Sequence, residues 1–156
     1  MKFNIRPARA ADALAVGHLA KQFADYLREL GDQTDFQLSA ETYLRDGFGD
    51  APAFAGLVAE NESGVIGYLL YHFGYDSDSA ARTLHIADLY VDASARNHGV
   101  GKALMARAAS IARDAGADEM IWSVFHRNAL ATAFYERIGA ERITEVFFMK
   151  MKASAF

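Results

Sequence analysis

The segment RNHGVGK, residues 96–102, places an arginine, two glycines and a lysine directly before an apolar helical pattern. The first backbone N–H groups of a helix have no acceptor within the helix, and with the positive end of the helix dipole they bind anions. Gly99 and Gly101 lack the Cβ atom that would hold a bulky polyphosphate away from those amides. Arg96 and Lys102 are expected to add mobile positive charge. The segment therefore predicts a pyrophosphate-binding loop.

Two common phosphate-binding motifs do not fit this loop. The dinucleotide motif G-x-G-x-x-G requires a glycine where the chain has Leu104. The Walker motif requires four residues between its glycines and a terminal Lys-Ser or Lys-Thr pair, which the loop lacks. An ordinary turn between a strand and a helix is the simpler alternative for an isolated Gly-x-Gly.

A second candidate for chemistry is an acid within an apolar strand. Asp88 lies among Ile86, Leu89 and Tyr90. A carboxylate in such surroundings is costly unless it is hydrogen-bonded or functional. Asp88 is therefore either a catalytic group or a side chain that satisfies a neighbouring loop amide.

Composition excludes several classes of function. The chain has 156 residues, of which 52% are hydrophobic and 23% charged, and its net charge is −4. It has no basic stripe, so nucleic acid is not an expected partner. It has no cysteine, which excludes thiol nucleophiles, disulfides and cysteine-ligated metals, and the histidines lack ligand spacing, so no metal site is expected. No targeting or membrane segment is recognised, which predicts a cytoplasmic protein without membrane contact.

The elements that position these residues can be read as one domain, residues 1–156. Strands are expected at FNIRPA, in three runs between residues 54 and 91, at EMIWSVF and at ITEVFFMKM. Helices are expected from Asp12 to Gly31, after Ser39, from about 99 to 115, and over 128–139. Tyr68, Tyr71, Phe73 and Tyr75 alternate along one strand, which predicts packing. The fold class is α+β, with a mostly antiparallel central sheet and helices on both faces.

The loop and a downstream segment resemble a known family. Residues 96–101 match the R/Q-x-x-G-x-G/A signature of the GNAT superfamily of acyl-CoA-dependent N-acetyltransferases. Residues 128–140, NALATAFYERIGA, resemble the segment in which that family carries a cofactor-contacting asparagine and an F-Y-x-x-x-G-F/A pattern. The order of expected elements over residues 3–151 also agrees. The chain is most similar to the diamine and thialysine acetyltransferase branch.

The resemblance implies acetyl-CoA as the acetyl donor and assigns roles to particular residues. Backbone groups of the strand before the loop would pair with the pantetheine arm, and amides of the loop and of the first helical turn would hold the pyrophosphate. Asn128 would contact the cofactor, and Tyr135 would face the thioester sulfur and act as the general acid. The implied cofactor-binding residues are Leu89, Tyr90, Val91, Arg96, Asn97, His98, Gly99, Val100, Gly101, Lys102, Ala103, Asn128 and Tyr135.

A primary amine attacks the acetyl carbonyl only in its neutral form, and a lysine-like amine with a pKa near ~10.4 is mostly protonated at pH 7. Asp88 is the candidate base that removes the proton, directly or through water. Polyamine-acetylating relatives carry a glutamate immediately before this aspartate, whereas this chain has Ala87, so the identity of the base is open. The backbone N–H of Leu89 is the expected donor to the developing oxyanion. Direct attack is expected because the chain has no cysteine.

The expected function is therefore acetyl transfer from acetyl-CoA to a small cationic amine, a polyamine or a lysine-like compound. Three alternatives are a non-catalytic acyl-CoA sensor, an interaction module whose loop is only a turn, and an acetyltransferase acting on a protein N-terminus or lysine. The apolar run VFFMKM and the habit of the branch predict a homodimer.

Overall fold

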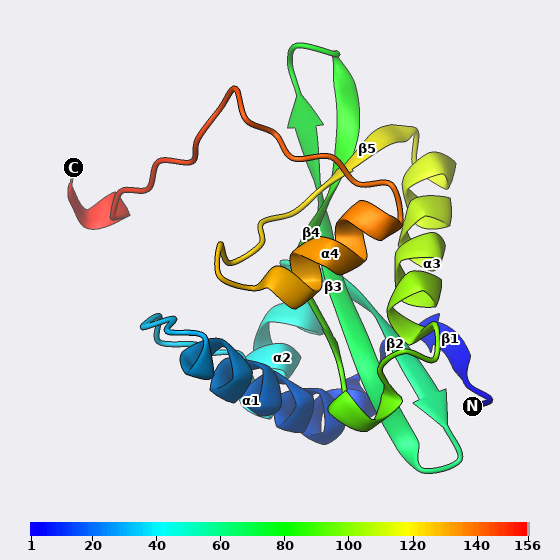
Figure 1. Cartoon of the computed structure of the whole chain (residues 1–156). Coiled ribbons are helices and arrows are strands. Elements are labelled where there is room, and N and C mark those ends of the chain that lie inside the picture. The colour runs from blue at the N-terminus through cyan, green and yellow to red at the C-terminus, as the bar shows by residue number, and fades with distance from the viewer. Residues whose placement is uncertain (156) are drawn as a thin grey trace.

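The computed structural model describes residues 1–155, and within this range the strands form one sheet in the order β1-β2-β3-β4-β5 (Figure 1). The first four strands pair antiparallel, and β5 runs parallel to β4. Their bounds are β1 Asn4–Pro7, β2 Ala55–Asn61, β3 Gly64–Asp76, β4 Ala81–Val91 and β5 Ala117–Ile121. The predicted antiparallel meander is confirmed.

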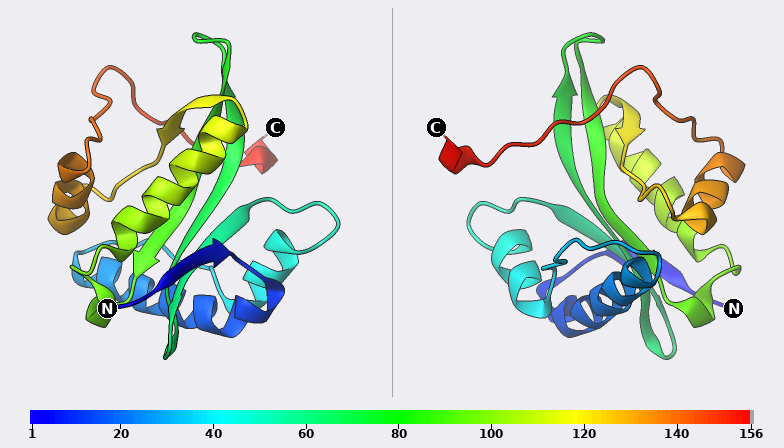
Figure 2. Two further views of the ribbon diagram at one scale, coloured as in Figure 1. Left: turned by 90° about the vertical axis from the view of Figure 1, so that its right-hand side faces the viewer. Right: turned by 60° about the vertical axis from the view of Figure 1, so that its left-hand side comes forward.

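Helices cover both faces of the sheet, as the sequence predicted (Figures 1 and 2). One face carries α1, Ala13–Glu29, and α2, Ala40–Gly47, and the other carries α3, Val100–Asp114, and α4, Ala129–Arg137. Each face has its own apolar cluster, one beneath α1 and one beneath α3. None of the helices in the described part of the chain is long and apolar enough to span a bilayer.

The helix starts follow local capping chemistry. The Ser39 hydroxyl accepts a hydrogen bond from the backbone N–H of Thr42 at the start of α2. At the start of α4, the Asn128 side-chain oxygen accepts one from the N–H of Ala131. Each bond satisfies one of the amides that a helix start leaves free, so these boundaries follow from the sequence.

A β-bulge interrupts β4 beside the candidate acid. Leu70 of β3 lies opposite Asp88, whereas the next residue, Tyr71, lies opposite Ile86, so Ala87 is the extra residue. A bulge reverses the alternation of side chains beyond it. Ile86 therefore packs into the cluster beneath α3, and Asp88 lies on the opposite face of the sheet.

β5 is an edge strand and diverges from β4. It pairs only with residues 82–85 of β4, so residues 86–91 have β3 on one side and no strand on the other within the described chain. The predicted strand EMIWSVF is too long, because Trp122–Phe125 continue without strand pairing. The divergence opens the sheet in front of Asp88.

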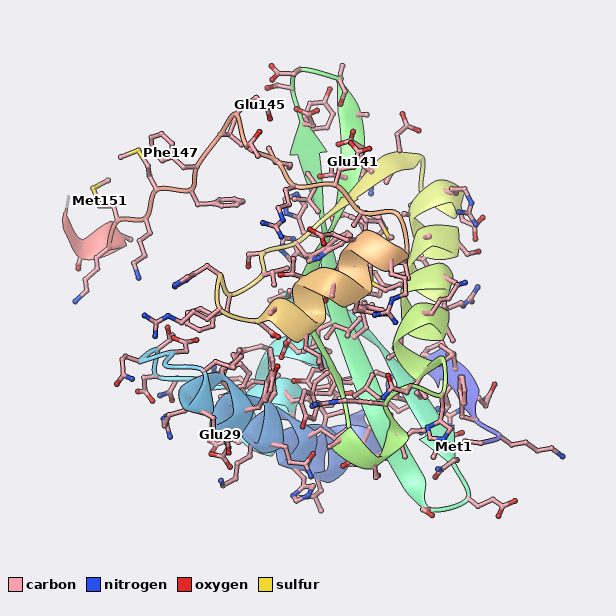
Figure 3. All side chains as sticks on the ribbon, in the orientation of Figure 1. Met1, Glu29, Glu141, Glu145, Phe147 and Met151 are labelled. Carbon is pink, nitrogen blue, oxygen red and sulfur yellow. The ribbon has the colours of Figure 1, made fainter. Side chains whose placement is uncertain are left out.

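The predicted last strand is wrong. Residues 143–151 make no backbone hydrogen bond to other backbone groups within residues 1–155, and the segment extends away from the sheet (Figures 1 and 3). The ITEVFFMKM pattern favours a strand, but a strand also requires a neighbouring edge to pair with.

The predicted packing role of two aromatic residues is also wrong. β3 and β4 form a hairpin that extends beyond the end of β5 (Figure 1). Phe73 and Tyr75 lie on this hairpin and are exposed, Tyr75 by 70%. No helix covers them, so their alternation does not correspond to burial.

Candidate active site

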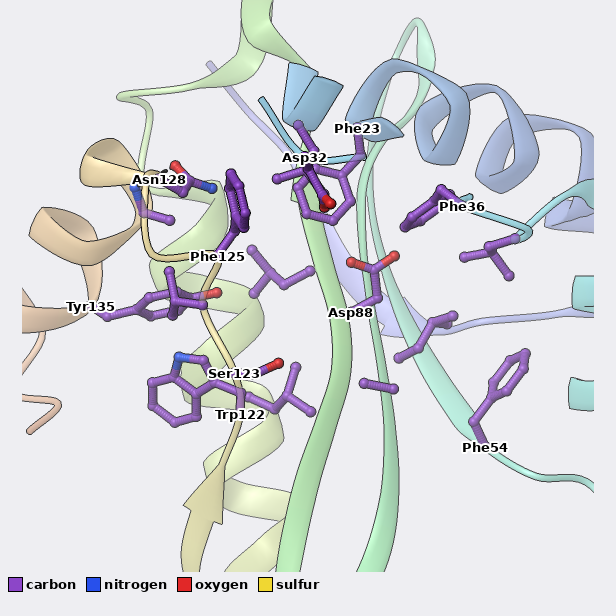
Figure 4. A pocket seen from close by; sticks show the side chains of 18 residues that line it. Phe23, Asp32, Phe36, Phe54, Asp88, Trp122, Ser123, Phe125, Asn128 and Tyr135 are labelled. Carbon is purple, nitrogen blue, oxygen red and sulfur yellow. Dashed lines mark hydrogen bonds between the residues drawn. The ribbon is translucent and has the colours of Figure 1, made fainter. Parts of the chain in front are cut away.

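A pocket of about 560 Å³ lies where β4 and β5 diverge (Figure 4). Its walls come from α1, the segment between α1 and α2, β4, the residues after β5, and α4. Asp88 and Tyr135, which the sequence assigned to catalysis, both line it. The fold thus brings together an acid from a strand and a phenol from a later helix.

The carboxylate of Asp88 is held by a buried tyrosine. The Tyr68 hydroxyl donates a hydrogen bond to Asp88 Oδ2 at 2.6 Å, and Tyr68 is itself fully buried. Removal of the carboxylate from bulk water raises the pKa of Asp88 to about 6, although the Tyr68 hydroxyl and the backbone amide of Leu89 act to lower it. Asp88 is therefore ionised at neutral pH and can accept a proton, as a general base must.

Tyr135 lies across the pocket on α4. Its ring packs against Trp122 at 4.9 Å and Phe134 at 5.0 Å between centroids. Burial and, secondarily, the negative charge of Asp88 raise the pKa of Tyr135 to about 12. The phenol therefore stays protonated throughout the physiological range and can donate a hydrogen bond.

Asn128 closes the pocket at the start of α4. It is buried, and its side-chain oxygen accepts hydrogen bonds from the Tyr26 hydroxyl at 2.9 Å and from the N–H of Ala131 at 3.1 Å. These two bonds fix the amide plane. The side-chain NH₂ group is then the part of Asn128 that can serve a ligand.

The predicted pyrophosphate loop has free amides. Within the described chain, the backbone N–H groups of residues 97–102 donate to no acceptor, and the N–H of Ala103 is the first to bond back, to the Gly99 oxygen. Gly99 adopts a left-handed φ of 83° immediately before α3 and has open space around it. Val100 is buried, so only its backbone can meet a ligand. This arrangement fits an anion at the start of α3.

The side chain of Arg96 makes several contacts within the protein, whereas the sequence predicted a mobile charge. Its Nε donates to the Val91 oxygen at 3.1 Å, and its guanidinium lies 5.3 Å from the ring centroids of both Tyr26 and Tyr90. Tyr90, also assigned to the cofactor, is buried on the α1 face. Arg96 therefore joins the loop to α1 and β4, and Lys102 is the exposed cation at the start of α3.

Gly101 has a second role beyond the loop. A Cβ atom at this position would lie 3.2 Å from the Phe134 ring. The glycine thus allows α3 and α4 to approach each other closely, which in turn sets the position of Tyr135. A substitution here would disturb helix packing as well as phosphate binding.

Comparison with known proteins agrees with this geometry. Residues 18–140 match the Acetyltransferase (GNAT) family. The chain belongs to this family. It is 33% identical over 149 residues to thialysine N-epsilon-acetyltransferase of Bos taurus, covering 90% of this chain and 85% of that protein. It is 32% identical over 145 residues to spermidine/spermine N(1)-acetyltransferase-like protein 1 of Homo sapiens, covering 88% of this chain and 20% of that protein.

A solved structure of an integron cassette protein from the mobile metagenome of V. cholerae superposes with a TM-score of 0.79 at 24% identity, over 98% of this chain and 94% of that one. This likeness shows the fold, whereas the family match and the two named relatives identify an acetyl-CoA-dependent N-acetyltransferase of the diamine and thialysine branch.

Three further residues of this N-acetyltransferase pocket were not assigned a functional role from the sequence. Tyr26 holds Asn128, Tyr68 holds Asp88, and Asp32 lines the pocket from the segment after α1. Tyr26 and Tyr68 occupy apolar elements in which a tyrosine ordinarily packs. Asp32 belongs to the acidic stretch 29–50, for which the sequence leaves two interpretations open, a solvated surface or a segment that attracts cationic amines.

Gly99→Val is expected to raise the KM of the N-acetyltransferase for acetyl-CoA about 10-fold or more. A branched side chain disfavours the left-handed φ and covers the free amides of the loop. Steady-state kinetics at saturating amine would measure the effect.

Gly116→Val is the matched control, because Gly116 has a similar φ of 73° and equally open surroundings at the other end of α3. It should cost comparable stability and leave the KM unchanged. Equal KM values in both variants would contradict the loop assignment.

Proposed function

We propose that this N-acetyltransferase transfers an acetyl group from acetyl-CoA to the primary amine of a small cationic substrate, a polyamine or a lysine-like compound, by direct attack. The charge of the pocket carries this proposal. Its described lining includes two carboxylates, Asp32 and Asp88, and no lysine, arginine or histidine. An aromatic and acidic pocket favours a cation.

The two carboxylates suit different parts of such a substrate. Asp88 lies on β4, whereas Asp32 lies in the segment after α1, near Phe23 (Figure 4). Hydrogen bonding from Thr34 lowers the pKa of Asp32, so this carboxylate stays ionised in the neutral range. Asp88 can serve the reacting amine while Asp32 attracts a second cationic group.

The residues present also fit the acetyl donor. The free amides of residues 97–102 can hold its pyrophosphate, and the unpaired edge of β4 can pair with its pantetheine arm. Leu89 lies on that edge beside Asp88. Acetyl-CoA supplies an activated acyl group as a thioester.

The pocket residues then divide the proton transfers between them. Asp88, ionised above pH ~6, accepts the proton of the substrate ammonium and leaves the neutral amine as the nucleophile. The backbone N–H of Leu89 donates to the Asp88 carboxylate while that group is ionised, and once Asp88 has taken up the proton this N–H can stabilise the negative charge that develops on the acetyl oxygen. Tyr135 donates a hydrogen bond to the sulfur as the carbon–sulfur bond breaks and negative charge grows there.

The named relatives support the same substrate class. The Bos taurus relative is a thialysine N-epsilon-acetyltransferase, and the Homo sapiens relative is spermidine/spermine N(1)-acetyltransferase-like. On that basis we propose that the substrate of this chain is also a cationic primary amine.

We further propose that residues 1–156 act as one catalytic domain, as a homodimer in the cytoplasm.

A thiol-release assay with acetyl-CoA and a panel of amines tests the proposal. Diamines, polyamines and lysine analogues should be acetylated with a higher kcat/KM than neutral monoamines of matched length. Absence of turnover with every amine, despite tight acetyl-CoA binding, would favour the sensor alternative. Turnover only with peptides would favour a protein substrate.

Asp32→Asn should raise the KM for doubly charged amines about 10-fold while leaving the KM for acetyl-CoA unchanged. Asp35→Asn is the control, because this nearby acid is exposed and does not line the pocket. Equal effects of the two substitutions would show that Asp32 acts only through general surface charge.

A further inference from the structure

A buried tyrosine lies directly behind the candidate base. The Tyr68 hydroxyl donates to Asp88 Oδ2 at 2.6 Å, a distance typical of a hydrogen bond to an ionised carboxylate. Tyr68 is completely buried in the cluster beneath α1 and does not line the pocket, whereas Asp88 does. Tyr68 therefore cannot touch a substrate, and any effect that it has on the reaction must pass through Asp88.

The β-bulge in β4 creates this contact. Asp88 lies opposite Leu70, which is two residues beyond Tyr68 on β3, so Tyr68 and Asp88 are diagonal neighbours on the same face. Diagonal neighbours are about 7–8 Å apart, which is within reach of a long aromatic side chain. The register of the outer part of the hairpin, continued without the bulge, would instead place Asp88 opposite Leu69, in the cluster beneath α3. Tyr68 could not reach it there.

The Tyr68 hydroxyl acts as a donor. Burial and the nearby charge of Asp88 raise the pKa of Tyr68 well above its usual value, so the phenol stays protonated. Within the part of the chain that the structure describes, Asp88 is its only hydrogen-bond acceptor. The bond also orients the acid, because turning the carboxylate away would leave a buried donor unsatisfied.

We propose that Tyr68 is a positioning residue, which holds Oδ2 of Asp88 so that Oδ1 takes the substrate proton, and which favours the ionised form of this carboxylate. The inference rests on the proposed role of Asp88 as the base. Figure 4 shows the Asp88 carboxylate among the side chains that line the pocket. Tyr135 and Asp32 line the same pocket, but within residues 1–155 Tyr68 is the only side chain that donates a hydrogen bond to Asp88.

The proton transfer then has a defined direction at Asp88. One N–H bond of the substrate ammonium breaks, its electron pair stays on the nitrogen as the nucleophile, and an O–H bond forms at Oδ1. Oδ2 becomes the carbonyl oxygen of the neutral acid and keeps the hydrogen bond from Tyr68. The contact with Tyr68 thus persists through the step, although it is strongest while Asp88 is ionised.

Tyr68→Phe is expected to raise the pKa of Asp88 above its value of about 6 by about 1 to 2 units, the shift for loss of a hydrogen bond to a charged group. The substitution removes the donor and keeps the ring that packs beneath α1. The acid limb of kcat/KM for the amine should move to higher pH by the same amount. Activity should therefore fall about 2-fold to 10-fold at pH 7 and approach that of wild type at pH 9.

Tyr43→Phe is the matched control. Tyr43 is also fully buried in the cluster beneath α1, and its hydroxyl donates at 3.1 Å to the backbone oxygen of Arg9. This variant should also lose one buried hydrogen bond, yet its pH profile should match that of wild type. An equal displacement of the acid limb in both variants would assign the effect to the buried cluster as a whole and would overturn the proposal.

Carbon-13 NMR without substrate measures the contact apart from catalysis. The Asp88 carboxyl signal is assigned by its absence from Asp88→Asn. In wild type, the Cζ signal of Tyr68 should titrate together with Asp88, with an apparent pKa of about 6. A Tyr68 signal that does not change with pH, or an Asp88 pKa that is the same in wild type and Tyr68→Phe, would overturn the proposal.

The two measurements together separate this inference from the proposed function. A raised Asp88 pKa in Tyr68→Phe without a displaced acid limb would reject Asp88 as the base, and the positioning role would fail with it. In the Asp88→Asn background, Tyr68→Phe should lower the rate at pH 7 no further. A further loss as large as that in wild type would show that Tyr68 acts independently of Asp88, contrary to the proposal.

Discussion

Asp88→Asn is expected to lower kcat/KM for the amine about 10²-fold to 10⁴-fold at pH 8, the range for loss of a positioned general base. The amide retains the shape of the side chain and can still accept the hydrogen bond from Tyr68, but it cannot take the ammonium proton. Rates with acetyl-CoA saturating measure the effect. The KM for acetyl-CoA should change little.

The pH profile identifies the base. Because the pKa of Asp88 is raised to about 6, wild-type activity should fall below pH ~6 as the carboxylate becomes protonated. This limb should be absent in Asp88→Asn, so the two enzymes should differ most above pH 6 and converge below it. A wild-type limb that persists in the variant would assign the proton transfer to another group.

Stability measurements separate lost chemistry from misfolding. The pKa of Asp88 is raised from 3.8 to about 6 in the folded protein, so the folded protein binds this proton more tightly than the unfolded chain does. The free energy of unfolding therefore falls as the pH rises from 4 to 6 and the carboxylate becomes ionised. The full cost is about 3 kcal/mol above pH 6. Asp88→Asn should therefore be more stable than wild type at pH 8, and the gain should vanish near pH 4.

Tyr135→Phe is expected to slow the acetyl-transfer step about 10²-fold, the scale of a lost hydrogen bond to a charged group. The tyrosine pKa of about 12 exceeds that of a thiol, near ~8.5, so complete proton transfer from tyrosine to sulfur would be uphill by roughly 5 kcal/mol. Tyr135 should act by hydrogen bonding while charge grows on sulfur. Pre-steady-state measurement is required, because slow product release can mask a chemical defect.

Tyr71→Phe is the matched control for this prediction. Burial also raises the pKa of Tyr71, but its ring lies outside the pocket in the cluster beneath α3. Both variants should retain wild-type acetyl-CoA affinity, and only Tyr135→Phe should lose rate. Transfer at the wild-type rate in Tyr135→Phe would leave Tyr135 with a packing role alone.

The sequence by itself determined the features that depend on neighbouring residues. The helix start at Gly99 and the caps at Ser39 and Asn128 are local chemistry, and each appears in the structure near its predicted position. Residues 96–102 and 128–140 also contained enough of the family pattern to identify the N-acetyltransferase. The meander followed because its hairpins join strands that are adjacent in sequence.

Only the tertiary structure decided the features that depend on residues distant in sequence. The extra residue Ala87 in β4 appears only in the pairing with β3, yet it determines the face on which Asp88 lies. The bond that holds Asp88 comes from Tyr68, and Arg96 packs on the rings of Tyr26 and Tyr90.

Residues 143–151 show most clearly that a local sequence pattern does not determine strand pairing. Their alternation predicts a strand, but the pattern does not specify which edge will pair with it. A strand is stable only when its backbone groups bond to another strand, and that partner is not encoded in the nine residues themselves. The described chain leaves them unpaired, although one edge of β5 is also unpaired, because pairing depends on where the rest of the fold directs the segment.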